Sequence, residues 1–173
     1  SPEDGTSTET VSIPAAGVMA ADATTGKILQ IQQTVKTNSD AIGSVGSGWI
    51  DVSNNSVTIT PSSTDSKIFI MAMVNGSASV DGLLRLVRNS TPIADRGVGN
   101  PAGTAFIGSR GVSYEGFSST MIYLDNPQTT SATTYKWQIA GSGSTTFYLN
   151  RTPVNDTADE TTTCIITAWE VAA

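Results

Sequence analysis

The chain has 173 residues, a formal net charge of −6 and only 14% charged residues, against roughly a quarter in an average soluble domain. It has no histidine and a single cysteine, which excludes the commonest catalytic base, a disulfide within the chain and any zinc site built from cysteines. The acidic balance argues against nucleic acid as a partner, because lysine and arginine contacts to phosphates dominate that affinity. The longest apolar run, residues 68–74, is too short to cross a bilayer, and no signal peptide is visible.

Residues 1–25 differ from the rest because they carry four acidic residues and no lysine or arginine. Their larger apolar residues are Val11, Ile13, Val18 and Met19. One interpretation is a disordered tail. The other is an extended arm that becomes ordered when these four residues contact a partner, since terminal segments are ordered only when something holds them.

From residue 26 onward, short runs rich in valine, isoleucine, threonine and aromatic residues alternate with glycine, serine, asparagine and proline. This pattern predicts one all-β domain over residues 26–173, a jelly-roll sandwich of about ten strands preceded by the N-terminal arm. We expect the strands at residues 27–36, 48–52, 55–60, 66–74, 83–89, 105–108, 117–124, 133–140, 145–150 and 162–171.

The strand at 66–74 is apolar on both faces, and so are residues 121–124 and 162–171. A sandwich in a lone monomer usually leaves its outer faces polar, so these strands need a second cover. Contact between copies of the chain is the simplest cover, and the arm or a long loop is the alternative. The residues predicted at the contact between subunits are Phe69, Met71, Met73, Ile165 and Trp169.

Arg85 alternates with Leu84 and Leu86 and is placed among apolar neighbours, where a charge needs a partner. We therefore add Arg85 to the predicted contact, as a member of an ion pair within or between subunits. Recognition of an anionic glycan or carboxylate is the alternative.

Residues 90–116 form a long polar stretch, and long loops of this kind are often functional. The charged and amide residues predicted to face a partner there are Asp95, Arg96, Asn100 and Arg110. The acidic residues Asp156, Asp159 and Glu160 lack the spacing of a calcium motif and indicate a solvated turn. No residue set selects a catalytic mechanism, a metal site or a cofactor, so we expect none; a polysaccharide hydrolase is a distant third reading.

Several separated segments resemble a known family. They are Gly26–Gln30 (GKILQ), residues 59–68 (ITPSSTDSKI), 86–89 (LVRN), 123–127 (YLDNP), 130–136 (TSATTYK) and 165–171 (IITAWEV). In this order they look like a family of short tailed-phage virion proteins and fibre-end domains, common in cyanophages and other aquatic phages. The resemblance covers about residues 26–173.

The resemblance implies a jelly roll of the tumour-necrosis-factor or C1q kind that assembles as a homotrimer, sits on the virion surface after assembly in the host cytoplasm, and has no enzymatic activity. Two roles stay open. A capsid decoration (cement) protein would bind the major capsid protein or another virion protein through its arm. A tail or head fibre tip would turn residues 90–116 toward the host and a surface glycan.

Overall fold

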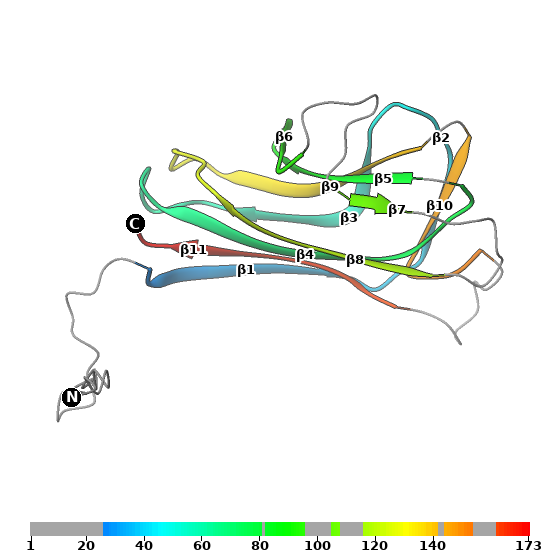
Figure 1. The fold of residues 1–173 in the computed structure, drawn as a ribbon. Coiled ribbons are helices and arrows are strands. Elements are labelled where there is room, and N and C mark those ends of the chain that lie inside the picture. The colour runs from blue at the N-terminus through cyan, green and yellow to red at the C-terminus, as the bar shows by residue number, and fades with distance from the viewer. Residues whose placement is uncertain (1–25, 81, 96–104, 108–115, 142–143, 154–161) are drawn as a thin grey trace, which may run out of the picture.

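The computed structural model describes residues 26–80, 82–95, 105–107, 116–141, 144–153 and 162–173, which form two antiparallel β-sheets packed face to face (Figure 1). The strands are β1 (Ile28–Lys36), β2 (Asp40–Val45), β3 (Ile50–Ile59), β4 (Lys67–Ala78), β5 (Gly82–Arg88), β6 (Thr91–Ile93), β7 (Ala105–Ile107), β8 (Phe117–Asp125), β9 (Thr133–Gly141), β10 (Thr145–Leu149) and β11 (Cys164–Val171).

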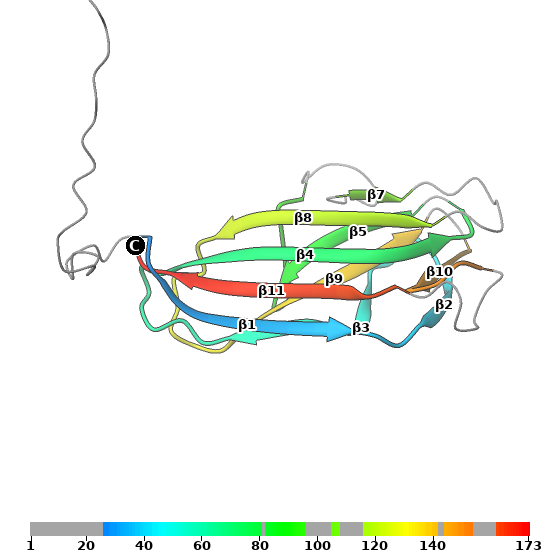
Figure 2. The same cartoon turned by 90° about the horizontal axis from the view of Figure 1, so that it is seen from below.

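The strand order gives the sandwich its topology. In the first sheet β11 lies between β1 and β4, and β8 pairs with the other side of β4 (Figure 2). The short strands β10 and β2 extend this sheet at one end. In the second sheet β9 lies between β3 and β5, and both β6 and β7 pair with β5. Each sheet thus combines strands from both halves of the chain, with long connections that cross between the sheets. The predicted all-β jelly-roll sandwich is confirmed.

The core lies between the sheets and follows from period-two alternation along the strands. On β4 the side chains of Ile68, Ile70, Ala72 and Val74 point inward and are fully buried. The second sheet contributes the inward-facing residues of β9 to the same core. One of them, Trp137, is among the largest fully buried side chains. A single cluster of buried residues runs through both sheets.

Three local differences from the predicted strands have physical reasons. Residues 50–59 form one strand, because the Asn54-Asn55 step is an irregularity in the register with β9 and Asn54 adopts a positive φ of 56°; asparagine tolerates this conformation. No strand was predicted at residues 40–45, but β2 forms there by pairing with β10. Strand β6 lies in the stretch expected as loop, where Pro92 is accommodated because β6 is an edge strand.

The two ends of the described domain meet. The Gly26 amide donates to the Ala172 carbonyl at 2.8 Å, and the Ala172 amide donates to the Lys27 carbonyl at 2.8 Å. The predicted arm, residues 1–25, lies outside the described residues, together with Val11, Ile13, Val18 and Met19. Over the ranges that the structure covers, no helix is long and apolar enough to cross a membrane.

Candidate functional site

The outer face of the first sheet is built from residues that the strand register brings into three rows across β1, β11, β4 and β8. Residues directly opposite one another in paired strands project from the same face. The first row contains Ile31, Trp169, Phe69 and Leu124; the second contains Gln33, Thr167, Met71 and Ile122; the third contains Val35, Ile165, Met73 and Thr120. We call these twelve residues the apolar face, since nine of them are hydrophobic and none is charged.

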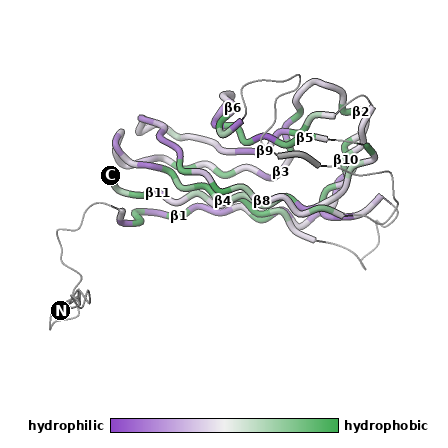
Figure 3. The backbone as a smooth tube through the Cα atoms, viewed as in Figure 1, coloured by the Kyte–Doolittle hydropathy of each residue, from purple (hydrophilic) through white to green (hydrophobic). Residues whose placement is uncertain are grey.

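Several members of the apolar face are exposed to solvent in the single chain. The exposed fraction is 54% for Ile31, 40% for Met71, 60% for Ile122 and 56% for Leu124. Figure 3 shows hydrophobic segments along β4 and β8, the middle and the edge of this sheet. Contiguous exposed apolar surface of this kind marks a contact with another molecule.

The centre of the apolar face is hollowed. The rings of Phe69 and Trp169 pack with centroids 5.4 Å apart at an interplanar angle of 50°, a tilted geometry that aromatic pairs favour. Beside them lies a shallow hollow of about 220 Å³. It is lined by Gln33, Met71, Met73, Thr120, Ile165, Thr167 and Trp169. The flexible methionine side chains at its floor can adapt to an inserted apolar group.

The outer face of the second sheet has the opposite character. The Thr58 and Thr134 hydroxyls form a cross-strand hydrogen bond of 2.7 Å. Next to them, Lys136 Nζ donates to Asp51 Oδ2 at 2.5 Å, and this hydrogen bond holds the pKa of Asp51 below its usual value although burial opposes it. One sheet of the sandwich therefore presents a solvent-compatible surface and the other does not.

The structure brings together five of the six residues predicted at the subunit contact: Phe69, Met71, Met73, Ile165 and Trp169 all belong to the apolar face. Arg85 does not, because β5 belongs to the second sheet and Arg85 lies on that sheet's outer face. Burial lowers the pKa of Arg85, while the charges of Asp95 and Asp51 oppose this shift.

Of the predicted partner-facing residues, Asp95 is half-buried just after β6. Arg96, Asn100 and Arg110 lie outside the described residues, as do Asp156, Asp159 and Glu160.

Four hydrophobic members of the apolar face were missed as site residues: Ile31, Val35, Ile122 and Leu124. Their signal was present, because Ile31 and Val35 alternate with polar residues in β1 and residues 121–124 are continuously apolar. What the sequence lacked was the register that places these residues beside Trp169 and Phe69.

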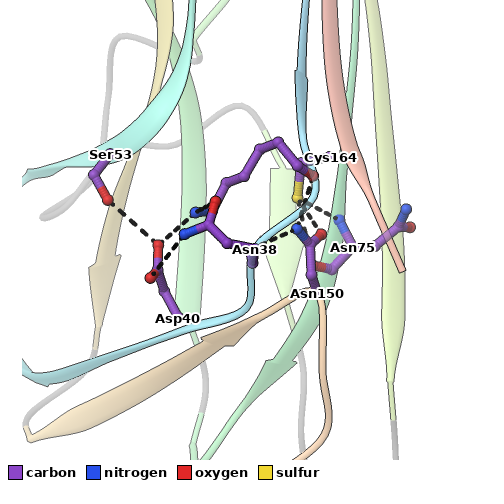
Figure 4. A network of polar contacts seen from close by, with 7 residues as sticks. Asn38, Asp40, Ser53, Asn75, Asn150 and Cys164 are labelled. Atoms are coloured by element: carbon purple, nitrogen blue, oxygen red, sulfur yellow. Dashed lines mark hydrogen bonds and ion pairs between the residues drawn. The ribbon is translucent and has the colours of Figure 1, made fainter. Parts of the chain in front are cut away.

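The ionisable groups of the interior serve as structural links. At one end of the sandwich, buried Lys36 pairs with Asp40 at 2.5 Å, and Asn150 Nδ2 donates to the Lys36 and Asn38 carbonyls (Figure 4). The Cys164 thiol donates to Asn150 Oδ1 at 3.0 Å, and burial raises the pKa of this thiol. A buried thiol with a raised pKa is a poor nucleophile.

A second internal link joins the two sheets. Arg88 Nη1 contacts both Asp125 oxygens, at 2.8 and 2.9 Å, and the Tyr135 hydroxyl donates to Asp125 Oδ2 at 2.7 Å. Burial, followed by the bond to Asp125, raises the pKa of Tyr135. Within the described ranges no group of three or more histidine, cysteine, aspartate or glutamate side chains is placed to hold a metal ion.

Comparison with known proteins assigns no family to the chain. No protein-family model matches the chain, and no curated protein matches it. Among solved structures, the chain is similar to dimeric latent PorU from Porphyromonas gingivalis, with 10% identity and a TM-score of 0.43 over 90% of this chain and 14% of that one. It is also similar to the infectious bursal disease virus VP2 subviral particle, with 15% identity and a TM-score of 0.30 over 93% of this chain and 42% of that one. The chain thus spans less than half of either protein, and likenesses of this strength say nothing about its role.

Proposed function

We propose that the chain is a structural protein of a phage virion, a homotrimeric decoration protein that binds the assembled head and stabilises it. The observation that carries the proposal is the apolar face, because contiguous exposed apolar surface of this kind marks a contact with another molecule. A closed ring of three copies needs two complementary contact surfaces on each copy, and we assign the apolar face to one of them. The sequence resemblance to short tailed-phage virion proteins supplies the location.

Stabilisation of the head follows from mass action. A protein that binds the assembled shell, and not its separated subunits, shifts the equilibrium toward the shell. In this proposal residues 1–25 contact the capsid, with Val11, Ile13, Val18 and Met19 as the apolar groups. No catalytic step, cofactor, nucleic acid or membrane insertion is part of the proposed role.

A fibre tip that contacts the host is the second candidate. The same sequence segments support it equally, and residues 90–116 would then face the host. The two candidates differ in copy number, since a decoration protein is present in hundreds of copies per particle and a fibre tip in tens or fewer. Quantitative mass spectrometry of purified virions separates them.

The oligomer is tested by sedimentation equilibrium of the purified chain. We expect a species of about 54 kDa, three times the 17.9 kDa of one chain. Met71→Glu should dissociate it, because the carboxylate would be buried without a partner at the contact. Ser56→Glu is the matched control, since it adds the same charge to the exposed polar face of the second sheet. A stable monomer of the unaltered chain, or equal dissociation by both variants, contradicts the proposed contact.

The capsid role is tested by mixing the chain with virions stripped of it. The full chain should rebind and raise the temperature at which the heads release DNA. A chain beginning at residue 26 should remain trimeric and fail to rebind. Rebinding by the shortened trimer would show that residues 1–25 are not the capsid contact.

A further inference from the structure

The outer face of the second sheet carries a series of side-chain hydrogen bonds that the proposed trimer contact does not involve. Lys136 donates to Asp51, and Gln138 Nε2 donates to the other Asp51 oxygen at 2.7 Å. Gln138 Oε1 in turn accepts a hydrogen bond from Arg85 Nε at 2.8 Å. These hydrogen bonds run across β3, β9 and β5, in which Asp51, Gln138 and Arg85 are direct neighbours.

At the end of this series of hydrogen bonds, the Arg85 guanidinium is held by two contacts. Its central carbon lies 4.1 Å from the centroid of the Trp49 ring, within the range of a cation–π contact. The second contact is the Nε bond to Gln138, so the position of the guanidinium is restricted while its two Nη atoms are not used by either contact. Among the described residues they have no hydrogen-bond acceptor, although Arg85 is only partly exposed.

A guanidinium prepared in this way suits a planar anion. Two parallel N–H donors match the two oxygens of a carboxylate, and such a pair is stronger and more specific than a bond from lysine. Because Gln138 and Trp49 already restrict the side chain, binding costs little additional side-chain entropy. Asp95 and Asp51 are the carboxylates whose charges act on Arg85. Both Asp51 oxygens are already engaged by Lys136 and Gln138, and no hydrogen bond from Arg85 to Asp95 is present among the contacts of the described residues.

We propose that this face binds a polysaccharide that carries carboxylates, with Arg85 holding one carboxylate and the surrounding side chains contacting the sugar. The neighbours of Arg85 have the required mixed chemistry: the Trp49 indole is an apolar plate with one polar edge. The Gln138 amide and the hydroxyls of Ser56, Thr58 and Thr134 lie on the same outer face.

The surroundings favour a polysaccharide over an acidic peptide. An extended peptide binds most readily by pairing with a free sheet edge, whereas Arg85 lies on the face of β5, which pairs with β9 on one side and with β6 and β7 on the other. The face of a sheet, unlike its edge, suits a polymer that makes many weak, repeated side-chain contacts. The site is complete within one copy of the chain, so it does not depend on the proposed trimer; in a trimer three such faces would add avidity.

The test is isothermal titration with a galacturonic-acid oligosaccharide and, as the matched ligand, the same oligosaccharide with its carboxyl groups methyl-esterified. We expect the unaltered chain to bind the acid form and not the ester. Arg85→Gln should weaken binding at least about tenfold, as expected for loss of a bidentate charged contact. Arg85→Lys should weaken binding by a smaller but measurable factor, because lysine keeps the positive charge but lacks the two parallel N–H donors of the guanidinium.

Arg151→Gln is the control variant, because Arg151 is also half-buried and lies over an aromatic ring, that of Tyr148, at 5.1 Å. It should leave binding unchanged, and circular dichroism should show all variants folded. The proposal is overturned if the ester binds as well as the acid, or if Arg151→Gln weakens binding as much as Arg85→Gln does. It is also overturned if no uronate binds at millimolar concentration, and binding of poly-glutamate alone would assign the face to an acidic protein.

Discussion

Glu170 shows how a single carboxylate can hold a loop in place. The side chain is fully buried on β11 and accepts hydrogen bonds from the Ser62 amide and hydroxyl, both at 2.6 Å, and from Gln30 Nε2 at 2.7 Å. Burial by itself raises the pKa of Glu170, but the bonds from Ser62 and Gln30 outweigh it and lower the pKa to about 2, against an ordinary 4.5. Glu170 thus joins β1, β11 and the segment that leads into β4.

The lowered pKa predicts an acid-dependent loss of stability. A carboxylate whose pKa is depressed by folding stabilises the protein fully above its unfolded pKa, and that contribution disappears as the pH falls from about 4.5 toward 2. Glu170→Gln should lower the free energy of unfolding at pH 7 by about 2 kcal/mol, since a charged acceptor of three donors is lost. Urea titrations at several pH values measure both effects.

Asp65→Asn serves as the control, because Asp65 is exposed. It should leave the pH dependence of unfolding nearly intact, whereas Glu170→Gln should flatten it between pH 5 and 2. If both variants keep the slope of the unaltered chain, Glu170 is not the group that links folding to protons.

At the scale of elements, β4 is the strand on which the first sheet depends. Its first half pairs with β11 and its second half with β10, while β8 pairs along its other side. The changeover takes place at Gly76, where the backbone of β10 approaches closely. A Cβ atom at this position would overlap the Tyr148 carbonyl oxygen and crowd the Leu149 Cα at 3.2 Å.

Gly76→Ala should therefore separate β10 from β4 and destabilise the fold by about 2–4 kcal/mol, because backbone atoms cannot move aside as a flexible side chain can. Thermal unfolding measures the loss. Gly43→Ala, on neighbouring β2, is the matched control: its new methyl would meet only the Thr146 hydroxyl oxygen at 3.8 Å. Equal stability of the two variants would contradict the close approach at Gly76.

The sequence predicted strands well and sheets less well. Alternation along residues 66–74 and 162–171 separates the two faces of each strand, and it grouped Phe69 and Trp169 at one predicted contact surface. The structure places both on the outer face of the first sheet, where their rings pack together. Alternation cannot tell which sheet a strand joins, so Arg85 was grouped with them although β5 pairs with β9. Strand β2 was not predicted, because its pairing with β10 is a long-range contact, whereas the Gly43-Ser44 step within it indicates a turn.

At the scale of the whole molecule, the two outer faces of the sandwich differ in their chemistry. The apolar face has no charged member, and the Arg85 contacts lie on the opposite side of the core. An assembly through the apolar face would leave the second sheet turned outward. The two proposals are therefore compatible, because one surface binds copies of the chain and the other remains free.

The uncharged contact predicts how self-association responds to salt. Ion pairs at a surface are screened as ionic strength rises, whereas burial of apolar groups is not weakened in this way. We expect the trimer to persist, with an unchanged or lower dissociation constant, when sodium chloride is raised from 0.1 to about 1 M. Sedimentation equilibrium at both concentrations measures it, and dissociation in high salt would mean that charged groups hold the copies together.

The meeting of Gly26 with Ala172 has a practical consequence for engineering. A short peptide could join the two ends of the domain without stretching either strand, and new ends could then be opened at an exposed hairpin such as Asn89-Ser90. Such a circular permutant would keep β1 beside β11 and would carry a fused cargo at the β5–β6 hairpin of the second sheet. Residues 1–25 could then be replaced by a different binding segment.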